Sequence, residues 1–99
     1  MNRSYYVYIT TNQYRTTLYI GVTNDIQKRL DQHLFDSQNS KKSFAGKYNC
    51  IYLVYYETFS SPEEAINREK QIKKWSREKK NLLIENFNPQ WETLNNQIF

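Results

Sequence analysis

Five side chains of this 99-residue chain combine residue types that move protons with residue types that bind ions. Tyr8, Tyr19 and His33 can each carry a proton, and the guanidinium of Arg29 can bind carboxylate or phosphate oxygens. Glu69 adds a carboxylate, which can hold a divalent cation. These side chains stand at positions where apolar residues would serve stability better, so we treat them as candidate functional residues.

The two tyrosines belong to a predicted β-hairpin near the N-terminus. Aliphatic residues such as Ile9 and Ile20 alternate with Tyr8 and Tyr19, and a period of two is typical of strands with one apolar face. If the loop is centred on residues 13–14, the antiparallel register sets Tyr8 directly opposite Tyr19, with Cβ atoms roughly 5 Å apart. The two phenols then lie side by side on the face that the aliphatic residues leave free.

A helix is predicted directly after the hairpin. Thr23-Asn24-Asp25 supplies its side-chain cap. Apolar residues then recur at every fourth position: Ile26, Leu30 and Leu34. Arg29 and His33 share this spacing on a neighbouring stripe. Arg29 could instead be a surface ion-pair partner of Asp25, and His33 a solvated helix residue.

Glu69 lies on a second predicted helix. Ser61 as cap, Pro62 at the first helical position and Glu64 three residues after the cap predict where this helix begins. Positions 65, 69, 72 and 76 form its inward stripe, which therefore contains the carboxylate of Glu69. An acid on such a stripe requires a cationic partner. Arg29, a lysine or a metal ion could supply it.

The remaining segments predict a small α+β protein. Residues 35–49 read as mostly loop with one short turn of helix, Cys50–Thr58 as a strand buried on both faces, and Ser76–Phe87 as a continuation of the second long helix. Trp91 is expected to dock on the body. We predict one domain over residues 1–99, with a three-stranded antiparallel sheet flanked by three or more helices.

Positive charge is concentrated in one block of the chain. The net charge is +4, and residues 68–80 hold seven lysines and arginines against two glutamates. A polyanion is the simplest partner for such a block, although a solvated helical face would have the same composition. The candidate nucleic-acid-binding residues are Lys70, Lys73, Lys74 and Arg77 in this block and Lys41, Lys42 and Lys47 in the preceding loop.

Composition excludes several other classes of protein. Cys50 is the only cysteine, which rules out an internal disulfide and a cysteine-based zinc site. The sequence shows neither an apolar run long enough for a membrane span nor a signal peptide behind Met1, so we expect a soluble cytoplasmic protein. Gly21 and Gly46 are the only glycines, so a GxxxxGK loop and a nucleophile elbow are also missing.

The order and spacing of the candidate residues resemble the GIY-YIG nucleases. The family's first triplet appears as Val7-Tyr8-Ile9, which departs from its glycine, and the second is intact as Tyr19-Ile20-Gly21. Arg29 follows Tyr19 by ten residues and His33 follows Arg29 by four, as the family pattern expects. Other segments resemble small stand-alone members, which are themselves similar to the N-terminal nuclease domain of the excinuclease: FAGKYN at 44–49, LVYYE at 53–57, EEAINREKQIKKWSREKK at 63–80 and NPQW at 88–91.

This resemblance implies a metal-dependent endonuclease that hydrolyses DNA phosphodiester bonds, with a place in DNA repair or recombination. It makes Glu69 the sole protein ligand of one divalent ion, Mg²⁺ or Mn²⁺. It assigns Arg29 to the scissile phosphate and Tyr8 to the attacking water, with Tyr19 and His33 in support. We therefore expect all five to surround one cleft, with Tyr8 and Glu69 on the same face of the sheet.

The identity of the general base stays open at this point. The pKa of a free phenol is about 10, so Tyr8 as a base needs Arg29, Lys47 or the metal ion to lower it. His33 could instead accept the proton relayed through Tyr8.

Two other classes of protein also remain. One is a nucleic-acid-binding module that keeps the fold but has lost turnover. The other is a protein-interaction domain that uses exposed aromatic residues such as Tyr14 and Phe99. The shape of the DNA, whether branched, flapped or single-stranded, and the oligomeric state cannot be inferred from the residues.

Overall fold

The computed structural model describes residues 4–39 and 44–97. The strands are β1 (Tyr5–Thr11), β2 (Leu18–Thr23) and β3 (Tyr52–Phe59). The helices are α1 (Ile26–Gln38), α2 (Phe44–Lys47), α3 (Pro62–Lys73) and α4 (Arg77–Phe87), followed by a 3₁₀ turn at Asn95–Gln97. This arrangement confirms the predicted α+β class and the three-stranded antiparallel sheet. None of the helices in the described ranges is long and apolar enough to cross a membrane.

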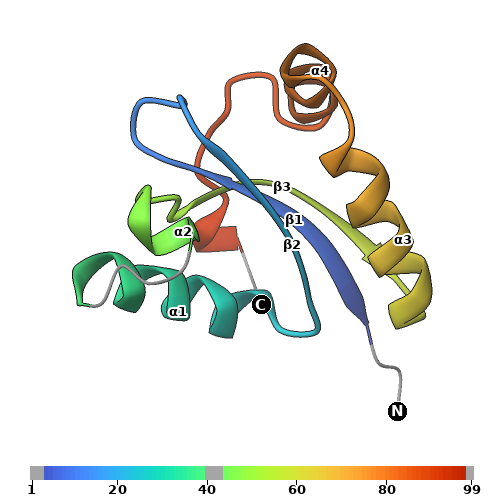
Figure 1. The fold of residues 1–99 in the computed structure, drawn as a ribbon, viewed down its shortest axis with the longest axis horizontal. Helices are drawn as coiled ribbons and strands as arrows, with labels where there is room; N and C mark the ends of the chain where they lie inside the picture. Colours follow the sequence, from blue (N-terminus) through green and yellow to red (C-terminus); the bar gives the residue numbers. More distant parts are fainter. Residues whose placement is uncertain (1–3, 40–43, 98–99) are drawn as a thin grey trace.

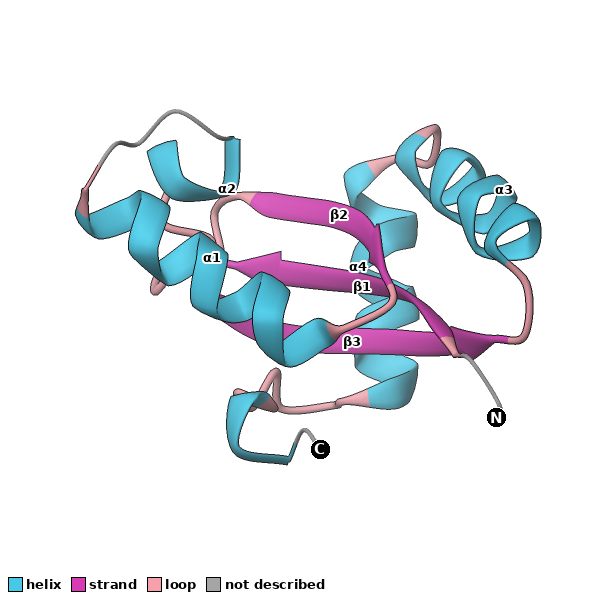
Figure 2. Cartoon of the chain, turned by 90° about the horizontal axis from the view of Figure 1, so that it is seen from below, coloured by secondary structure: helices cyan, strands magenta, loops and turns pink. Residues whose placement is uncertain are grey.

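The sheet has the strand order β2-β1-β3, and both of its pairings are antiparallel. Helix α1 lies on one side of the sheet, whereas α3 and α4 lie on the other (Figure 1). Strand β2 forms one border of the sheet, and the C-terminal segment runs beside β3 at the opposite border (Figure 2). Strand β1 is therefore the central strand and is covered on both faces.

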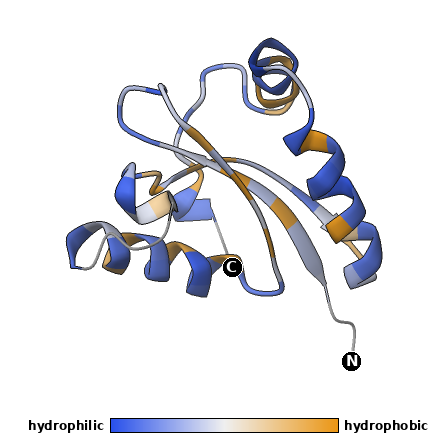
Figure 3. Cartoon of the chain, in the orientation of Figure 1, coloured by the Kyte–Doolittle hydropathy of each residue, from blue (hydrophilic) through white to orange (hydrophobic). Residues whose placement is uncertain are grey.

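Each face of the sheet carries its own hydrophobic cluster. Val7, Ile9 and Ile20 pack with Ala65 and Ile72 of α3 on one face. The other face holds a second cluster, formed by Tyr8, Ile26, Leu30, Leu53 and Leu94. The strands carry much of the hydrophobic colour between the largely hydrophilic helices in Figure 3. The face with the tyrosines is therefore a second buried layer, covered by α1.

The register of the hairpin differs from the predicted one by two residues. Tyr8 pairs with Gly21, and Tyr19 pairs with Thr10, so the two tyrosines are not directly opposite each other. The reason lies in the loop, where the side chain of Asn12 accepts hydrogen bonds from the backbone N–H groups of Thr16 and Thr17 and so stabilises a longer turn. A shift of two residues keeps every side chain on its face, so both phenols still face α1.

Helix α1 begins as predicted, but its buried side differs. The Asp25 side chain accepts a hydrogen bond from Lys28 N, which confirms the cap. Leu34 is 42% exposed, whereas His33 is 1% exposed. Leu34, the last residue of the apolar stripe, is therefore largely exposed, and the alternative in which His33 is a solvated helix residue is wrong. Helix α1 also continues to Gln38, into the segment predicted as loop, and α2 supplies the short turn expected there.

The second long helix is broken in two. Ser61 caps α3 with Pro62 in its first turn, as predicted. Ser76, however, caps a new helix, because its hydroxyl accepts a hydrogen bond from Lys79 N. The prediction of one continuous helix missed this serine, which is a strong N-cap residue. The break separates α3, which bears Glu69, from α4.

The C-terminal segment covers the free edge of β3. Leu94 N donates to Leu53 O at 2.8 Å, and the Asn95 side chain accepts from Leu53 N at 2.7 Å. These contacts replace strand pairing at that edge. Trp91 is half-buried and packs against the cluster under α3 and α4, which confirms its predicted docking. Among the described strands, β2 therefore keeps the sheet's accessible edge.

Asn88 is expected to be important for stability because it fastens the C-terminal segment to the sheet. Its buried amide donates to Val54 O at 3.1 Å and to Glu92 O at 2.8 Å, and it accepts from Glu92 N at 3.1 Å. Asn88→Ala should lower the free energy of unfolding by about 2–3 kcal/mol, because buried backbone groups lose their partners. Urea unfolding measures this. Asn96→Ala, at an exposed position, is the control and should change stability by less than about 0.5 kcal/mol.

Candidate active site

Tyr8 and His33 form the centre of a buried polar cluster under α1. Tyr8 Oη and His33 Nε2 are 3.0 Å apart and hydrogen-bonded, and the two residues are 0% and 1% exposed. The Tyr19 ring lies 6.0 Å from the Tyr8 ring and 5.1 Å from the His33 ring, measured between centroids. Side chains from β1, β2 and α1 therefore meet in one place.

Gly21 makes room for this cluster. A Cβ atom at Gly21 would lie 2.6 Å from Tyr8 Oη and 2.9 Å from Tyr19 Cε2, closer than real Cβ atoms come to such neighbours. Tyr8 is fully buried and cannot move aside at low cost. The glycine of the Tyr-Ile-Gly triplet is thus required by the two tyrosine rings packed against it.

Arg29 lies half-buried beside the tyrosines. Its hydrogen bond with Tyr8 raises the pKa of Arg29 above its ordinary value, so the guanidinium stays charged. Two buried nitrogen atoms of the cluster, Arg29 Nε and His33 Nδ1, have no hydrogen-bond partner within residues 4–39 and 44–97. Unsatisfied buried polar atoms cost about 1–3 kcal/mol each. The cluster therefore has hydrogen-bonding capacity that the described part of the protein does not use.

The alternative in which Arg29 pairs with Asp25 is not supported. The ion pairs found within the described ranges are Arg68–Glu57 and Lys73–Glu69. The Asp25 side chain is engaged in capping α1.

The pKa values of the two central groups move in opposite directions. Burial raises the pKa of Tyr8 well above its usual value, and the opposing hydrogen bond from Arg29 does not offset this. Arg29 thus lowers the Tyr8 pKa as expected, but burial outweighs this effect. Burial, assisted by the positive charge of Arg29, lowers the pKa of His33 to about 4. His33 is therefore neutral at pH 7 and can accept a proton.

This depressed pKa predicts that the protein loses stability in mild acid. The folded state binds the His33 proton only near pH 4, whereas the unfolded chain binds it near pH 6.5, so stability falls as pH drops through this window. The loss between about pH 7 and pH 5 should be about 2 kcal/mol. His33 is the only histidine, so one imidazole NMR signal reports its titration. His33→Gln should flatten the pH dependence, and an NMR midpoint near 6.5 would contradict the prediction.

Glu69 stands apart from the other four candidate residues. It lies on α3, and its partly buried side chain, 19% exposed, pairs with Lys73 at 3.3 Å between Oε1 and Nζ. Lys73 is thus the lysine partner that was one of the predicted options. Helix α3 packs on the face of the sheet opposite to Tyr8. The expectation that Tyr8 and Glu69 share a face is therefore wrong, since Tyr8 belongs to the α1 side.

The edge of β2 lies between these two faces. A pocket of about 320 Å³ at this edge is lined by Leu18, Tyr19 and Ile20 of β2 together with Lys73 and Lys80. Tyr19 belongs to the buried cluster, and Lys73 is the partner of Glu69. Groups from both faces thus border one pocket. Of the five candidate residues, however, only Tyr19 lines this pocket, so the expectation that all five surround one cleft is not met here.

The predicted nucleic-acid-binding residues fall into different environments. Lys41 and Lys42 lie outside the described residues. Lys70 and Lys74 are exposed, and Lys47 Nζ lies 5.5 Å from the ring centroid of Tyr48. Sequence reasoning did not single out Lys80, although it belongs to the same cationic block and lines the β2 edge pocket.

Arg77 has a structural contact that the sequence did not suggest. Its guanidinium donates to Arg15 O and Thr16 O at 2.6 and 3.0 Å, and to Asn81 Oδ1 at 2.8 Å. It therefore joins the start of α4 to the hairpin loop.

Two tyrosines, an arginine and a histidine cluster beneath the first helix of an antiparallel sheet. A carboxylate lies on the helix across the edge strand. This combination is that of a small nuclease-type domain. The family model of the GIY-YIG catalytic domain matches residues 4–81, and the chain belongs to the GIY-YIG nuclease family. The C-terminal segment that fastens β3 lies beyond this match.

The chain is also similar to proteins of the UPF0213 group. It is 41% identical over 71 residues to a UPF0213 protein of Bacillus pumilus, covering 70% of this chain and 67% of that protein. It is 35% identical over 85 residues to one of Haloquadratum walsbyi, covering 86% and 91%. The solution NMR structure of the UPF0213 protein BH0048 from Bacillus halodurans aligns with a TM-score of 0.50 at 30% identity, covering 83% of each chain. These similarities support the predicted fold and the predicted resemblance to small stand-alone members of the family.

Proposed function

We propose that this protein is a metal-dependent endonuclease that hydrolyses phosphodiester bonds in DNA. The observation that carries the proposal is the buried cluster itself, in which a hydrogen-bonded tyrosine and neutral histidine stand beside an arginine with an unpaired Nε. Hydrolysis of a phosphodiester needs a proton acceptor and a cation at the phosphate, and this cluster contains both.

The proposed roles follow from the positions of the groups. Arg29 binds the scissile phosphate, because its guanidinium is charged, partly exposed and incompletely hydrogen-bonded. Tyr8 is fully buried in the structure, so in this proposal it reaches the attacking water only when substrate binding opens the cluster. The water then gives a proton to Tyr8 Oη while the Tyr8 hydroxyl proton moves to His33 Nε2, which can accept it when the imidazole proton resides on Nδ1. Tyr19 packs against both rings and holds them in place. His33 is proposed as the acceptor because it is unprotonated at pH 7, whereas burial keeps Tyr8 in its protonated form.

Glu69 would hold the divalent ion, Mg²⁺ or Mn²⁺. Within the described ranges, no group of three or more histidine, cysteine or acidic side chains is arranged to hold a metal ion, so a cage built entirely of protein ligands is not the kind of site offered. A single, partly buried carboxylate suits Mg²⁺, which keeps several waters and takes further oxygens from phosphate. When bound, the ion supplies positive charge at the phosphoryl group and the leaving oxygen.

The DNA backbone crosses the edge of β2 in this proposal. The edge pocket is bordered by Tyr19 on the side of the buried cluster and by Lys73 and Lys80 on the side of α3 and α4. A phosphate over this edge lies between Arg29 and Glu69 without passing through the sheet. The exposed lysines that follow Glu69 then contact neighbouring phosphates.

The salt dependence of DNA binding tests this path. If Lys73 and Lys74 each contact a phosphate, their double alanine variant should lower the log–log slope of affinity against salt by about 1.8. The assay is run in EDTA so that no DNA is cleaved, and affinity should fall similarly for unrelated sequences. Glu85→Gln changes the net charge at an exposed site on α4 and should leave the slope unaltered. An unaltered slope in the lysine variant would show that these lysines form a solvated helical face and do not contact DNA.

The test of the proposed function is a cleavage screen on blunt, branched, flapped and single-stranded DNA, with Mg²⁺, Mn²⁺ or EDTA. Cleavage that needs the metal ion supports the enzyme, and a role in repair or recombination follows if branched or flapped DNA is preferred. Tight binding without cleavage on any substrate would leave a binding module of the same fold. We place the activity in the cytoplasm, in keeping with the single, buried thiol of Cys50.

A further inference from the structure

A second depression lies at the loop end of β1 and β2, away from the buried cluster. Two pockets with volumes of about 260 and 250 Å³ share Asn12, Gln13 and Tyr52 in their linings. We call this pair the hairpin groove. Its main side chains are Gln13, Tyr14, Arg15, Tyr48, Tyr52 and Trp91. The groove therefore combines four aromatic rings with a cation and an amide.

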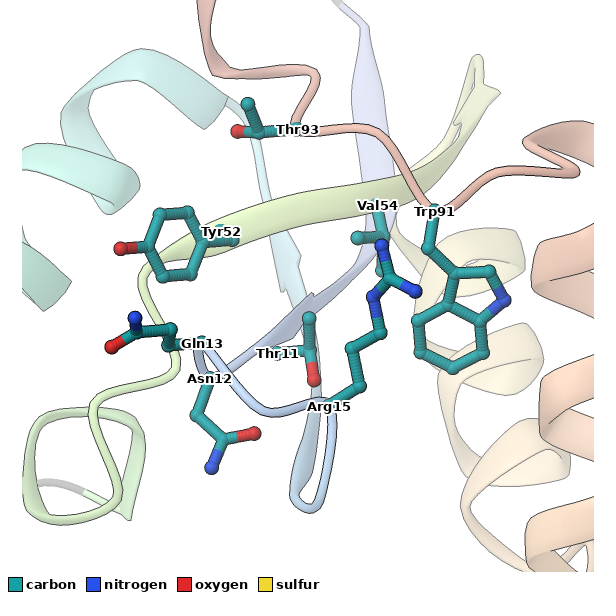
Figure 4. Close-up of a pocket in the computed structure, with 8 residues that line it drawn as sticks. All are labelled: Thr11, Asn12, Gln13, Arg15, Tyr52, Val54, Trp91 and Thr93. Atoms are coloured by element: carbon teal, nitrogen blue, oxygen red, sulfur yellow. The ribbon is translucent and has the colours of Figure 1, made fainter.

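The first pocket of the hairpin groove has planar walls. The rings of Tyr52 and Trp91 stand on opposite sides of it, and the Arg15 side chain extends between them (Figure 4). Arg15 Nη2 donates to Gln90 O at 3.1 Å, and its guanidinium carbon lies 5.9 Å from the Trp91 ring centroid. The guanidinium is thus held against Trp91 and leaves the space toward Tyr52 available to a flat group.

Polar groups of the groove remain available for a ligand. The Asn12 amide is occupied by the loop, since it accepts from Thr16 N and Thr17 N. The Gln13 amide and the Tyr52 hydroxyl, in contrast, have no hydrogen bond to another residue of the described ranges. Tyr14 is 77% exposed. These groups can donate and accept hydrogen bonds at the edges of a stacked ring.

The charge of the groove is suited to an anionic strand. Neither lining contains an aspartate or a glutamate, and Arg15 belongs to the first pocket. Lys47, adjacent to the second pocket, lies with its Nζ 5.5 Å from the Tyr48 ring centroid. Aromatic rings interleaved with cations are the usual means of binding single-stranded nucleic acid, because every base has a face that stacks.

We propose that the hairpin groove binds unpaired nucleobases of a single-stranded DNA segment. This inference rests on the proposed function and names its substrate class: single strands, overhangs or flaps rather than fully paired duplex. Asn12 directly follows β1 and lies four residues from Tyr8, about 13 Å along an extended chain, a distance that a few nucleotides span. Bases held in the groove would thus place a bond a few nucleotides away beside the hairpin that carries Tyr8 and Tyr19.

The experiment compares two labelled strands of about 12 nucleotides, one of deoxythymidine and one with the same phosphates but abasic sugars. Fluorescence anisotropy in EDTA measures binding without cleavage. The wild-type protein should bind the thymidine strand at least about tenfold more tightly, as expected for one or two stacked bases. Tyr52→Leu and Tyr14→Ala should each reduce this preference by about fivefold or more while leaving affinity for the abasic strand unchanged. Phe35→Leu, at another exposed aromatic residue outside the groove, should retain it.

Equal affinities of the wild-type protein for the two strands would overturn the proposal. A groove that binds a peptide or a second copy of the chain would give this result. Full retention of the preference by both tyrosine variants would also overturn it, and the exposure of Tyr14 means that unfolding cannot explain its result. Cleavage with Mg²⁺ is measured in parallel. Cleavage without base preference would reject the proposed nucleobase site but support the nuclease function. Base preference without cleavage of any DNA would reject the nuclease function but support the nucleobase site.

Discussion

Glu69→Gln should lower the rate of DNA cleavage by at least about a thousandfold, equivalent to about 4 kcal/mol in the barrier. Glutamine keeps the shape of the side chain but lacks the charge that holds a divalent cation. Glu69 is the single carboxylate available for this purpose in the proposed site, so no neighbouring ligand compensates. A contribution of several kcal/mol is typical of a metal ion that stabilises charge on a phosphoryl group.

The fold and the DNA affinity of this variant should remain nearly unchanged. The Glu69–Lys73 contact is an i,i+4 pair with a half-exposed lysine, and such pairs contribute less than about 1 kcal/mol. Glu85→Gln makes the same change in net charge at an exposed site on α4 and should cleave at the wild-type rate. Cleavage by Glu69→Gln within about tenfold of wild type would show that Glu69 does not hold the ion.

Local patterns were sufficient to predict most elements of this fold. Alternation around Ile9 and Ile20 predicted the two strands, and the caps at Asp25 and Ser61 predicted where α1 and α3 begin, because these signals depend on a few adjacent residues. The hairpin register was missed for a physical reason. It depends on the Asn12 side chain bonding to backbone groups four and five residues later, and the residue types in a loop do not reveal which of several turns forms.

The sequence grouped Tyr8, Tyr19, Arg29 and His33, and the structure brings these four together, whereas their burial and the position of Glu69 were not predicted. The spacing of Arg29 and His33 places both on one side of α1, and the structure brings them to Tyr8 and Tyr19. This spacing alone could not show that the side with Arg29 and His33 is buried, because the apolar residues recur on the neighbouring stripe. Burial in turn decides the direction of the pKa shifts. For that reason the sequence left the proton acceptor open, whereas the structure shows a neutral His33 and a protonated Tyr8 at pH 7.

Contacts between distant segments were beyond the sequence. The position of Glu69 across the edge of β2 depends on which face α3 covers, and a pattern within one helix does not specify this. The C-terminal segment is a similar case. Asn88 and Asn95 bond to the backbone of β3 and close one edge of the sheet, which leaves β2 as the edge over which a substrate can lie. The two borders of this small sheet thus differ: the C-terminal segment closes one, and in the proposed function the DNA backbone crosses the other.

Tyr8→Phe should lower cleavage by about a hundredfold or more, within the range of about 10²–10⁴ for loss of a group that transfers a proton. The substitution removes only the hydroxyl that joins Tyr8 to His33 and Arg29, while the ring still fills its place in the core. It should cost about 1–3 kcal/mol in stability, because His33 Nε2 loses its partner. Tyr5→Phe on the same strand, which packs on the opposite face, is the matched control and should cleave normally.

The pH dependence of kcat/KM separates the two possible proton acceptors, because it reports the ionisation of the free enzyme. If His33 accepts the proton, the wild-type rate should be nearly constant between about pH 6 and pH 9 and should fall only toward the His33 pKa of about 4. If an ionised Tyr8 were the base, its raised pKa would make the rate climb tenfold per pH unit across the same range. His33→Gln should reduce the rate to a level similar to that of Tyr8→Phe, since proton transfer requires both groups. If the wild-type kcat/KM rises with pH across this range and His33→Gln remains active, the proton acceptor is Tyr8 alone and no proton passes to His33.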